Sequence, residues 1–586
     1  MKEKSTLRKV ANDYLTHTRK NAGITLIALV ITIVVLLILA GVSIGMLTGE
    51  NGILTQAGKA KEKTDRATKI EQEQLDDVAG MMNNYEDSYN KSKGCNIPKL
   101  TTGMTPVNYN STKGTWEKCS TENWDWEYID QESNTTDGSE GNVGTSKWAN
   151  AMTEDGSLWV WIPRYAYKIT SGYHSATAGE IDVKFLVGTT NKDGDGNSYS
   201  TTYDMTVATT NEYMSDFVVH PTFTTNLEQG GWSAETTGFW VAKFEAGYVG
   251  SENANADKSS IDMTNVKYSS VKYTSNKWSD LTTQYGNIYG DTIPNETRMS
   301  YPIFKENVFS YTNVSIGDAF GLAQSLNEQG NPYGFSINCN THMMKNSEWG
   351  AVAYLTQSKY GRNGTEVSLN NYLVPKGNTR PTSMNTTFRA KTGYGAVSSP
   401  TASSSNTDVA LYNTEKGALA SSTGNVYGVY DLCGGADEYV SSYAEGLNNA
   451  GYSSYKSTDE YYAEYGSYLL AETNKKYKSI LSIDSNYATA ATNKGQMANY
   501  STHNNIFGDA MWETSMANDP ADLTGNAYSK RSWNSDYSAY PAGVFPFLLR
   551  GGRMGAGAEA GVFCFSYDAG ALSNSLAFRA CVVSPD

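Results

Sequence analysis

Residues Ile24 to Leu47 read ITLIALVITIVVLLILAGVSIGML and include no charged side chain. As an α-helix this stretch would be about 36 Å long, enough to cross a hydrocarbon core of about 30 Å. Basic residues dominate the segment before it, and they keep that end of a helix in the cytoplasm. These basic residues are Lys2, Lys4, Arg8, Lys9, Arg19 and Lys20. The sequence therefore predicts one membrane-spanning helix over residues 24–47, with the rest of the chain directed outward.

Charged residues follow up to about residue 90, and the helical pattern continues through them. Leu75, Val78, Met82 and Tyr85 recur at helical spacing and form a narrow apolar stripe suited to packing on a neighbour. The pattern predicts a long N-terminal helix over residues 24–90. A plain membrane anchor with a solvated stalk would share these features, and apolarity alone leaves that alternative open.

The sequence KNAG followed by ITLIALVITIVVLLILAGVSIG resembles the prepilin leader and first helix of type IV pilins and pseudopilins. The resemblance implies a leader over residues 1–23, cleavage after Gly23 by a prepilin peptidase, and methylation of Ile24. It implies as partners the pilus assembly machinery, other pilin subunits, and the inner membrane before assembly. The expected location is the cytoplasmic membrane as a single-pass protein, then the cell surface or an extracellular filament. Ala28 stands where that family has Glu, which favours a minor or tip subunit.

Charge and composition narrow the class of protein. The 586-residue chain has a formal net charge of −15, and its N-terminal segment is basic, so the body is strongly acidic. An acidic body repels a phosphate backbone, so no nucleic-acid partner is predicted. The 41 Tyr, the 54 Gly and a charged fraction of only 18% indicate a strand-and-loop surface domain. Six Cys in this length do not make a disulfide framework.

Residues 91–145 are polar and indicate a linker or a small subdomain, whereas residues 146–586 form one large domain. In the large domain, short apolar runs such as LWVWIPRYAYKI and GFWVAKFEAGY are typical of strands. Two helices are also predicted. SIGDAFGLAQSLNEQG opens with a capping pattern at Ser315 and Asp318, and KNSEWGAVAYLTQSKYG begins near Asn346. This mixture predicts an α+β domain with long loops.

Five motifs in order resemble the sulfatase-modifying, or formylglycine-generating, enzyme family, whose fold elaborates the C-type lectin fold. The matching residues are Lys243 and Glu245, Glu348 and Trp349, Gly428 with Tyr430, Asp431, Leu432, Gly434 and Glu438, Arg550 with Gly551 and Gly552, and Phe578 with Arg579. The resemblance implies a C-type-lectin-like domain in which the last two motifs lie on core strands. The expected fold class is thus α+β, with a long N-terminal membrane helix before this domain.

The enzymes of that family use two nearby Cys between the Arg-Gly-Gly motif and the closing Phe-Arg, a thiolate pair that suits copper. This chain has Cys564 alone in that interval, and Cys581 lies beyond it on the expected last strand. The five His are scattered without metal-ligand spacing: His17, His174, His220, His342 and His503. The sequence therefore predicts no catalytic residue and no metal site.

Calcium is the cofactor that the residues leave open. Asp193, Asp195, Asn197 and Asp204 follow the spacing of a calcium loop, but Ser198 stands where such a loop needs Gly. Glu438 lies in a segment that supplies calcium ligands in some members of the resembling family. There the neighbouring Asn of the family motif is replaced by Gly435.

A subset of that family lacks the catalytic Cys and serves as variable receptors of diversity-generating retroelements. The C-terminal sequence RGGRMGAGAEAGVFCFSYDAGALSNSLAFRACVV looks like such a variable region. The resemblance implies a non-catalytic, surface-displayed pilin-like adhesin for an unknown protein or glycan ligand. Val562 and Phe563 should point inward. The implied ligand-binding residues, expected to face solvent, are Trp533, Tyr537, Arg553, Met554, Glu559, Ser566, Tyr567 and Asp568.

Two other classes of protein stay open. One is a membrane-tethered enzyme related to formylglycine-generating enzymes, which a copper ion bound by two Cys would reveal. The other is a purely structural filament subunit.

Overall fold

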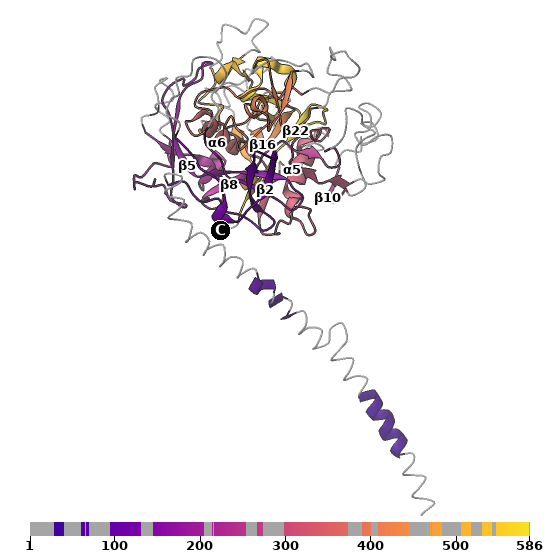
Figure 1. Cartoon of the computed structure of the whole chain (residues 1–586). Helices are drawn as coiled ribbons and strands as arrows, with labels where there is room; N and C mark the ends of the chain where they lie inside the picture. The colour runs from indigo at the N-terminus through magenta and orange to yellow at the C-terminus, as the bar shows by residue number, and fades with distance from the viewer. Residues whose placement is uncertain are drawn as a thin grey trace, which may run out of the picture. The chain divides into compact units, whose positions relative to one another are not determined.

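The protein is described from a computed structural model, whose described residues are drawn in colour in Figure 1. They fall into two compact units, Met1–Asn83 and Asn84–Asp586. The described ranges are 28–39, 60–69 with gaps, 94–130, 145–203, 214, 216–252, 266–273, 298–372, 390–399, 408–445, 466, 469, 471–482, 506–516, 530–541 and 546–584.

In the first unit, residues 28–39 form an α-helix whose apolar side chains are exposed. Among the described residues, no helix is both long enough and apolar enough to cross a membrane. The predicted long membrane-spanning N-terminal helix, and the single-pass membrane and surface localisation based on it, are therefore wrong. Gly23, Ile24 and the stripe of residues 75–85 lie outside the described residues.

A seven-stranded antiparallel sheet brings the start and the end of the second unit together. Its order is β13 (Asn340–Met343), β23 (Ala580–Val583), β8 (Gly238–Ala242), β4 (Leu158–Pro163), β3 (Asn150–Met152), β1 (Thr105–Asn110) and β2 (Thr115–Lys118). The C-terminal end of the chain accordingly lies near the early strands in Figure 1. Every residue of β4 and β8 is buried, which explains why both sequences are rich in large apolar residues.

A second sheet is built from the C-terminal part of the chain. Its order is β17 (Ser479–Ser482), β16 (Asp437–Glu445), β20 (Phe547–Gly551), β21 (Gly561–Asp568), β19 (Tyr537–Ser538) and β18 (Lys530–Arg531), and β22 (Leu576–Phe578) also pairs with β16. Strands β20 and β21 are antiparallel, whereas β19 and β21 are parallel. All of β20 is buried, so β20 forms the rigid centre of this sheet.

Smaller sheets and short turns complete the second unit. The strands are β5 (Tyr165–Ile169), β6 (Ile181–Phe185) and β7 (Val218–Val219) in one sheet, and the pairs β9 (Gly247–Tyr248) with β12 (Pro302–Ile303), β10 (Tyr268–Lys272) with β11 (Arg298–Ser300), and β14 (Tyr394–Ala396) with β15 (Val409–Leu411). The 3₁₀ turns are η1 (Thr121–Asn123), η2 (Pro221–Phe223), η3 (Leu227–Gln229), η5 (Ser325–Asn327), η6 (Glu472–Tyr477), η8 (Trp533–Ser535) and η9 (Met554–Glu559).

The α-helices of the second unit are few and short: α5 (Ile316–Gln324), α6 (Asn346–Gln357) and α7 (Glu415–Ala418) among the described residues. Helices α5 and α6 lie where the sequence predicts them, and the Ser315 hydroxyl caps α5 by accepting a hydrogen bond from the Asp318 amide. The described chain is nevertheless mainly β. The predicted α+β class is therefore wrong, because irregular, glycine-rich segments rather than helices connect most of the strands.

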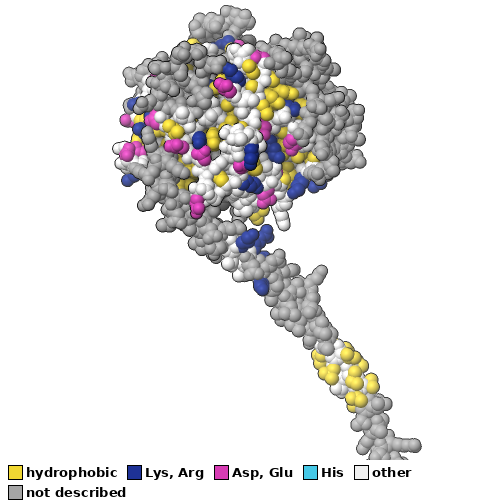
Figure 2. Space-filling model, in the orientation of Figure 1, with side chains coloured by type: hydrophobic (Ala, Val, Ile, Leu, Met, Phe, Trp, Pro, Cys, Tyr) yellow, Lys and Arg dark blue, Asp and Glu magenta, His cyan; other side chains and the backbone are white. Residues whose placement is uncertain are grey.

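The described part of residues 91–145 packs into the first sheet. Strand β1 pairs with β3, and the Trp124 ring stacks on Trp240 of β8 with 6.1 Å between ring centroids. The Tyr128 hydroxyl donates to the carbonyl oxygen of Trp161 at 2.7 Å. These contacts make this stretch part of the same core. On the face shown in Figure 2, acidic and basic side chains of the second unit are interspersed.

Candidate functional site

Most of the expected ligand-binding residues lie on strands β19 and β21 and on the turn η9, whereas Trp533 lies on η8 and Arg553 directly precedes η9. Strand β21 pairs with the buried strand β20 on one side and with β19 on the other. Six of the expected residues are partly exposed: Tyr537, Arg553, Glu559, Ser566, Tyr567 and Asp568. We call these six residues the β21 face, although on β21 itself Tyr567 points to the opposite side of the strand from Ser566 and Asp568. The strand beneath them cannot rearrange easily, because β20 belongs to the packed core.

Trp533 and Met554 do not belong to this face, so the prediction that they face solvent is wrong. Trp533 is 0% exposed, because its indole N–H donates to the carbonyl oxygen of Gly172 (2.6 Å) and its ring packs on Phe563. Met554 is also buried. The predicted inward orientation of Val562 and Phe563 is confirmed, since both are buried. Trp533 is therefore a core residue that packs against Phe563 of β21.

Two tyrosines and an ion pair lie together on the β21 face. Burial, and then the neighbouring Tyr567, Cys564 and Glu559, raise the pKa of Tyr537 to about 12. Glu559 pairs with Arg531 of β18, with 2.9 Å between Oε1 and Nη2. Both partners of this pair are partly exposed, so it contributes less than about 1 kcal/mol to the free energy of unfolding. A ligand could therefore separate Arg531 from Glu559 and bind either charge with little loss of stability.

Asp568 is hydrogen-bonded within the second sheet. Its carboxylate accepts hydrogen bonds from the Tyr439 hydroxyl (2.8 Å) and the Gly570 amide (2.7 Å). These bonds fix the direction of the Asp568 carboxylate before any ligand arrives, which reduces the entropy lost on binding. The charge of Arg553 opposes the effect of burial on Asp437, whose pKa burial raises to about 7.

The thiol that the resembling enzymes would use is buried here. Cys564 is 4% exposed, and burial together with the charges of Asp536 and Asp437 raises its pKa well above the ordinary value. Cys433 lies close enough to interact with Cys564, and burial raises its pKa in the same direction. A reactive cysteine needs an accessible, stabilised thiolate. Neither thiol has that environment.

Several motif residues form a buried ionic network between the two sheets. The Arg579 guanidinium donates to both carboxylate oxygens of Glu438, through Nη2 at 2.5 Å and through Nε at 3.0 Å. It also donates to the carbonyl oxygens of Ala242 and Tyr430, each at 2.8 Å. Because Arg579 occupies both oxygens of Glu438, the calcium role implied for Glu438 has no support in this geometry.

Two further carboxylates lie in the same network. Asp431 accepts hydrogen bonds from the Asn370 side-chain amide (2.8 Å) and the Gly393 amide (2.9 Å), and Glu245 accepts one from the Ser310 hydroxyl. Burial raises the pKa of both carboxyls, and for Glu245 the charge of Asp431 adds to it. The charge of Arg579 thus acts on three carboxyls, and its guanidinium is hydrogen-bonded to the carboxylate of Glu438. These motif residues hold the fold together.

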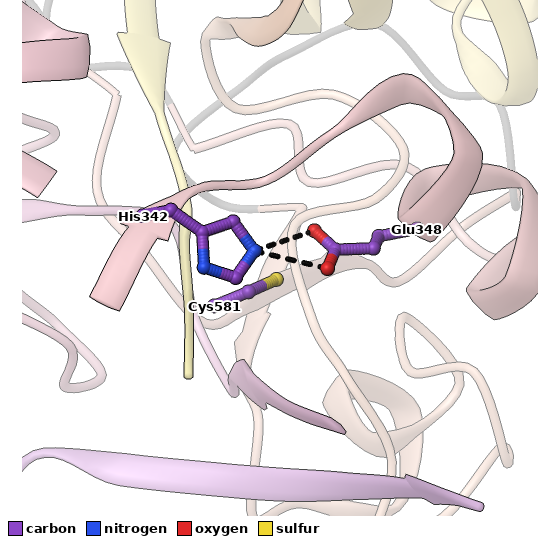
Figure 3. Close-up of side chains that lie close together, drawn as sticks. All are labelled: His342, Glu348 and Cys581. Carbon is purple, nitrogen blue, oxygen red and sulfur yellow. Dashed lines mark hydrogen bonds and ion pairs between the residues drawn. The ribbon is translucent and has the colours of Figure 1, made fainter. Parts of the chain in front are cut away.

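The possible metal-ligating cluster of the described residues consists of His342, Glu348 and Cys581 (Figure 3). His342 Nε2 lies 2.9 Å and 3.0 Å from the two carboxylate oxygens of Glu348. One potential ligand atom from each residue lies within 4.8 Å of the others, and all three residues are fully buried. Histidine, carboxylate and thiolate are ligand types that zinc accepts.

The local fold explains why these three side chains meet. His342 on β13 is directly opposite Cys581 on β23, so both side chains lie on one face of the first sheet. Glu348 lies in the first turn of α6, directly after β13, and accepts a hydrogen bond from the Lys345 amide (2.9 Å). The cluster thus forms where a strand turns into a helix.

The surroundings of the cluster favour a hydrogen-bonded role over a metal site. Burial alone would raise the pKa of Glu348, but His342 and Lys345 hold it below its ordinary value, so Glu348 is a carboxylate. Burial and the Glu348 charge raise the pKa of Cys581 well above the ordinary value, so the thiol favours its protonated form when no metal is bound. A structural zinc site also takes four ligands, and this cluster offers three beside a lysine.

The predicted calcium loop has another arrangement in the structure. Asp193 accepts hydrogen bonds from the amides of Asp195 (3.0 Å) and Asn197 (2.8 Å), and from the Tyr199 hydroxyl (2.5 Å). Its carboxylate oxygens thus stabilise the turn itself. Asp204 lies outside the described residues.

Comparison with known proteins adds no further identification. No protein-family model matches the chain, and no curated protein matches it.

Proposed function

We propose that this protein is a non-catalytic ligand-binding protein, and that the β21 face is its binding surface. The observation that carries the proposal is the contrast between this face and its base. Six partly exposed polar and aromatic side chains lie on β19, on β21, and on η9 and the residue before it, near the fully buried β20. Tyrosines with fixed neighbours suit recognition, because they offer apolar area and a hydroxyl at a low cost in entropy.

The state of the thiols supports binding over catalysis. The raised pKa of Cys564 and of Cys433 disfavours the thiolate that nucleophilic or copper chemistry needs. The His342, Glu348 and Cys581 cluster is fully buried, so a substrate would not reach it without opening of the core. Either a protein or a glycan ligand is compatible with the chemistry of the β21 face.

A binding screen with matched variants tests the proposal. The full chain would be applied to immobilised glycans and to a displayed library of random peptides. Tyr567→Ala and Tyr537→Ala should weaken binding of any ligand found by about tenfold or more, as expected for aromatic anchors. Tyr109→Ala, at a partly exposed tyrosine of the distant strand β1, is the matched control. Binding that survives both β21-face variants would contradict the assignment.

The implied diversification of this face is a second part of the proposal. Related copies of the gene should differ at the six residues of the β21 face, while Arg550, Phe563 and Arg579 should stay the same because they are buried. Sequencing the copies within one population tests this. Uniform residues across the β21 face would contradict diversification without affecting the binding proposal.

A further inference from the structure

Lys243, directly after β8, is a lysine in the core. Its side chain is 0% exposed, and its Nζ contacts three oxygen atoms: Oδ1 of Asn150 at 2.9 Å, and the carbonyl oxygens of Val426 (2.6 Å) and Gly428 (2.8 Å). Among the described residues, no carboxylate lies within salt-bridge distance of this amine. A buried cation without a paired anion is costly, so loss of the proton from Lys243 is easier here than in water.

Aromatic rings complete the surroundings of this amine. The Trp116 ring centroid lies 4.8 Å from Nζ, and the Tyr430 ring centroid lies 5.4 Å from it. Burial lowers the pKa of Lys243 well below the ordinary value, and the distant charge of Glu306 opposes this only in part. A desolvated neutral lysine is a nucleophile.

Asn150 presents its side-chain amide to Lys243 in a fixed orientation. The residue is 1% exposed, and its Nδ2 donates to the carbonyl oxygens of Trp148 (2.8 Å) and Tyr427 (2.9 Å). Its Oδ1 accepts from Lys243, and the electrophilic Cγ is bonded directly to that oxygen. Holding the amine and the amide together in this way replaces a slow encounter by an intramolecular reaction, which is a large gain in effective concentration.

We propose that Lys243 and Asn150 form an intramolecular isopeptide bond in the folded protein. Nζ of the neutral amine attacks Cγ of Asn150, and a new N–C bond forms. The Cγ–Nδ2 bond then breaks, and one proton moves from Nζ to Nδ2, so that the side-chain amide leaves as ammonia. No oxidant, reductant or cofactor is required.

The bond would cross-link two strands at the centre of the first sheet. Strand β4 lies between β3, which carries Asn150, and β8, which Lys243 follows. A covalent link between the outer two strands closes the chain from residue 150 to residue 243 around β4. Such a link stabilises a fold mainly by restricting the unfolded chain.

Peptide mapping of the full chain by mass spectrometry tests the proposal. After proteolysis, the segments that contain Asn150 and Lys243 should appear as one branched peptide, lighter than the sum of its parts by one ammonia. Loss of ammonia with two separate peptides would reveal a cyclic imide at Asn150 instead and would overturn the proposal. Two unmodified peptides would overturn it as well.

Two other lysines serve as controls within the same sample. Lys345 is equally buried, but its Nζ contacts the backbone oxygens of Gly230, Gly231 and Lys476 and no side-chain amide is within its hydrogen-bond contacts. Lys391 reaches Oδ1 of Asn307 at 3.0 Å in a partly buried contact. Both should be recovered unlinked, and a branched peptide at Lys345 would show that the digestion chemistry, not the geometry, makes the link.

Two variants test the reacting groups. Lys243→Arg and Asn150→Ala should abolish the branched peptide. If Lys243→Arg and Asn150→Ala fail to fold, the wild-type peptide map still decides whether the bond exists.

Discussion

Trp533 and Tyr567 both come from the region expected to bind a ligand, yet they differ in exposure. Trp533 is fully buried and hydrogen-bonded to Gly172, whereas Tyr567 is partly exposed. We therefore expect Trp533→Ala to lower the free energy of unfolding by about 3–5 kcal/mol, as for other buried aromatic residues. Tyr567→Ala should cost well under half of that. Urea unfolding of both variants measures the difference, and equal losses would contradict the assigned burial.

Glu348 is the residue on which the buried His342 and Cys581 cluster depends. Glu348→Gln removes the charge and one of the two acceptor oxygens that His342 and the Lys345 amide share, so it should cost about 3–5 kcal/mol, as when one partner of a buried pair is lost. The pKa of Glu348 is lower in the folded than in the unfolded protein. Its contribution is therefore present above the unfolded pKa and lost as the pH falls through the folded one.

Urea unfolding between about pH 3 and pH 7 tests this sign, because carboxyl groups titrate there. The wild type should lose stability relative to Glu348→Gln as the pH falls. Glu117→Gln is the matched control, since Glu117 forms an exposed pair with Lys113. That substitution should leave the free energy of unfolding nearly unchanged, because exposed ion pairs contribute little. A Glu348→Gln variant as stable as the Glu117→Gln variant would refute the role of the cluster.

At the scale of elements, the start of α5 depends on one hydroxyl. Ser315 Oγ accepts from the Asp318 amide at 3.1 Å, and the surrounding residues of the helix are buried. Ser315→Ala should lower the free energy of unfolding by about 0.5–2 kcal/mol, because it leaves a backbone amide of the first turn without a partner. Ser315→Thr, which keeps a capping hydroxyl, should cost less. Thermal unfolding of the two variants measures this difference. An equal loss of stability in both would show that packing around residue 315, and not the capping hydroxyl, stabilises the start of α5.

At the scale of the whole molecule, the core contains carboxyl groups whose burial outweighs their partners. Burial raises the pKa of Asp509 to about 6 and of Glu513 to about 7, and hydrogen bonds from Tyr167 and Tyr354 to Glu513 offset only part of that effect. Folded pKa values above the unfolded ones mean that the folded protein binds more protons. Stability is thus greatest below the unfolded pKa of these groups and falls as the pH rises towards 7.

The urea midpoint of the full chain should therefore decrease between about pH 5 and pH 7, the window between unfolded and raised folded pKa values. Glu513→Gln removes one of these titrating groups, so the urea midpoint of this variant should change less with pH than that of the wild type. A midpoint that rises over this interval would show that the lowered pKa groups dominate.

Some features of the fold could be predicted from sequence because they depend on neighbours in the chain. The capping pattern at Ser315 and the apolar alternation at Val562 and Phe563 are local, so the helix start and the inward side chains agree with the structure. The prediction of a membrane-spanning helix over Ile24 to Leu47 rested on apolarity alone, and no helix among the described residues is long and apolar enough to cross a membrane.

The tertiary structure decided which residues form sites. Trp533 is buried and donates a hydrogen bond to Gly172, which is 361 residues away in the sequence. His342 meets Cys581 only because strands β13 and β23 pair. Lys243 and Asn150 likewise meet across β4. No local pattern marks such pairs, because sequence periodicity reports which face of an element is apolar and not which distant element covers it. The free energy that selects these partners comes from burial and hydrogen bonding in the assembled core, so it exists only once the chain has folded.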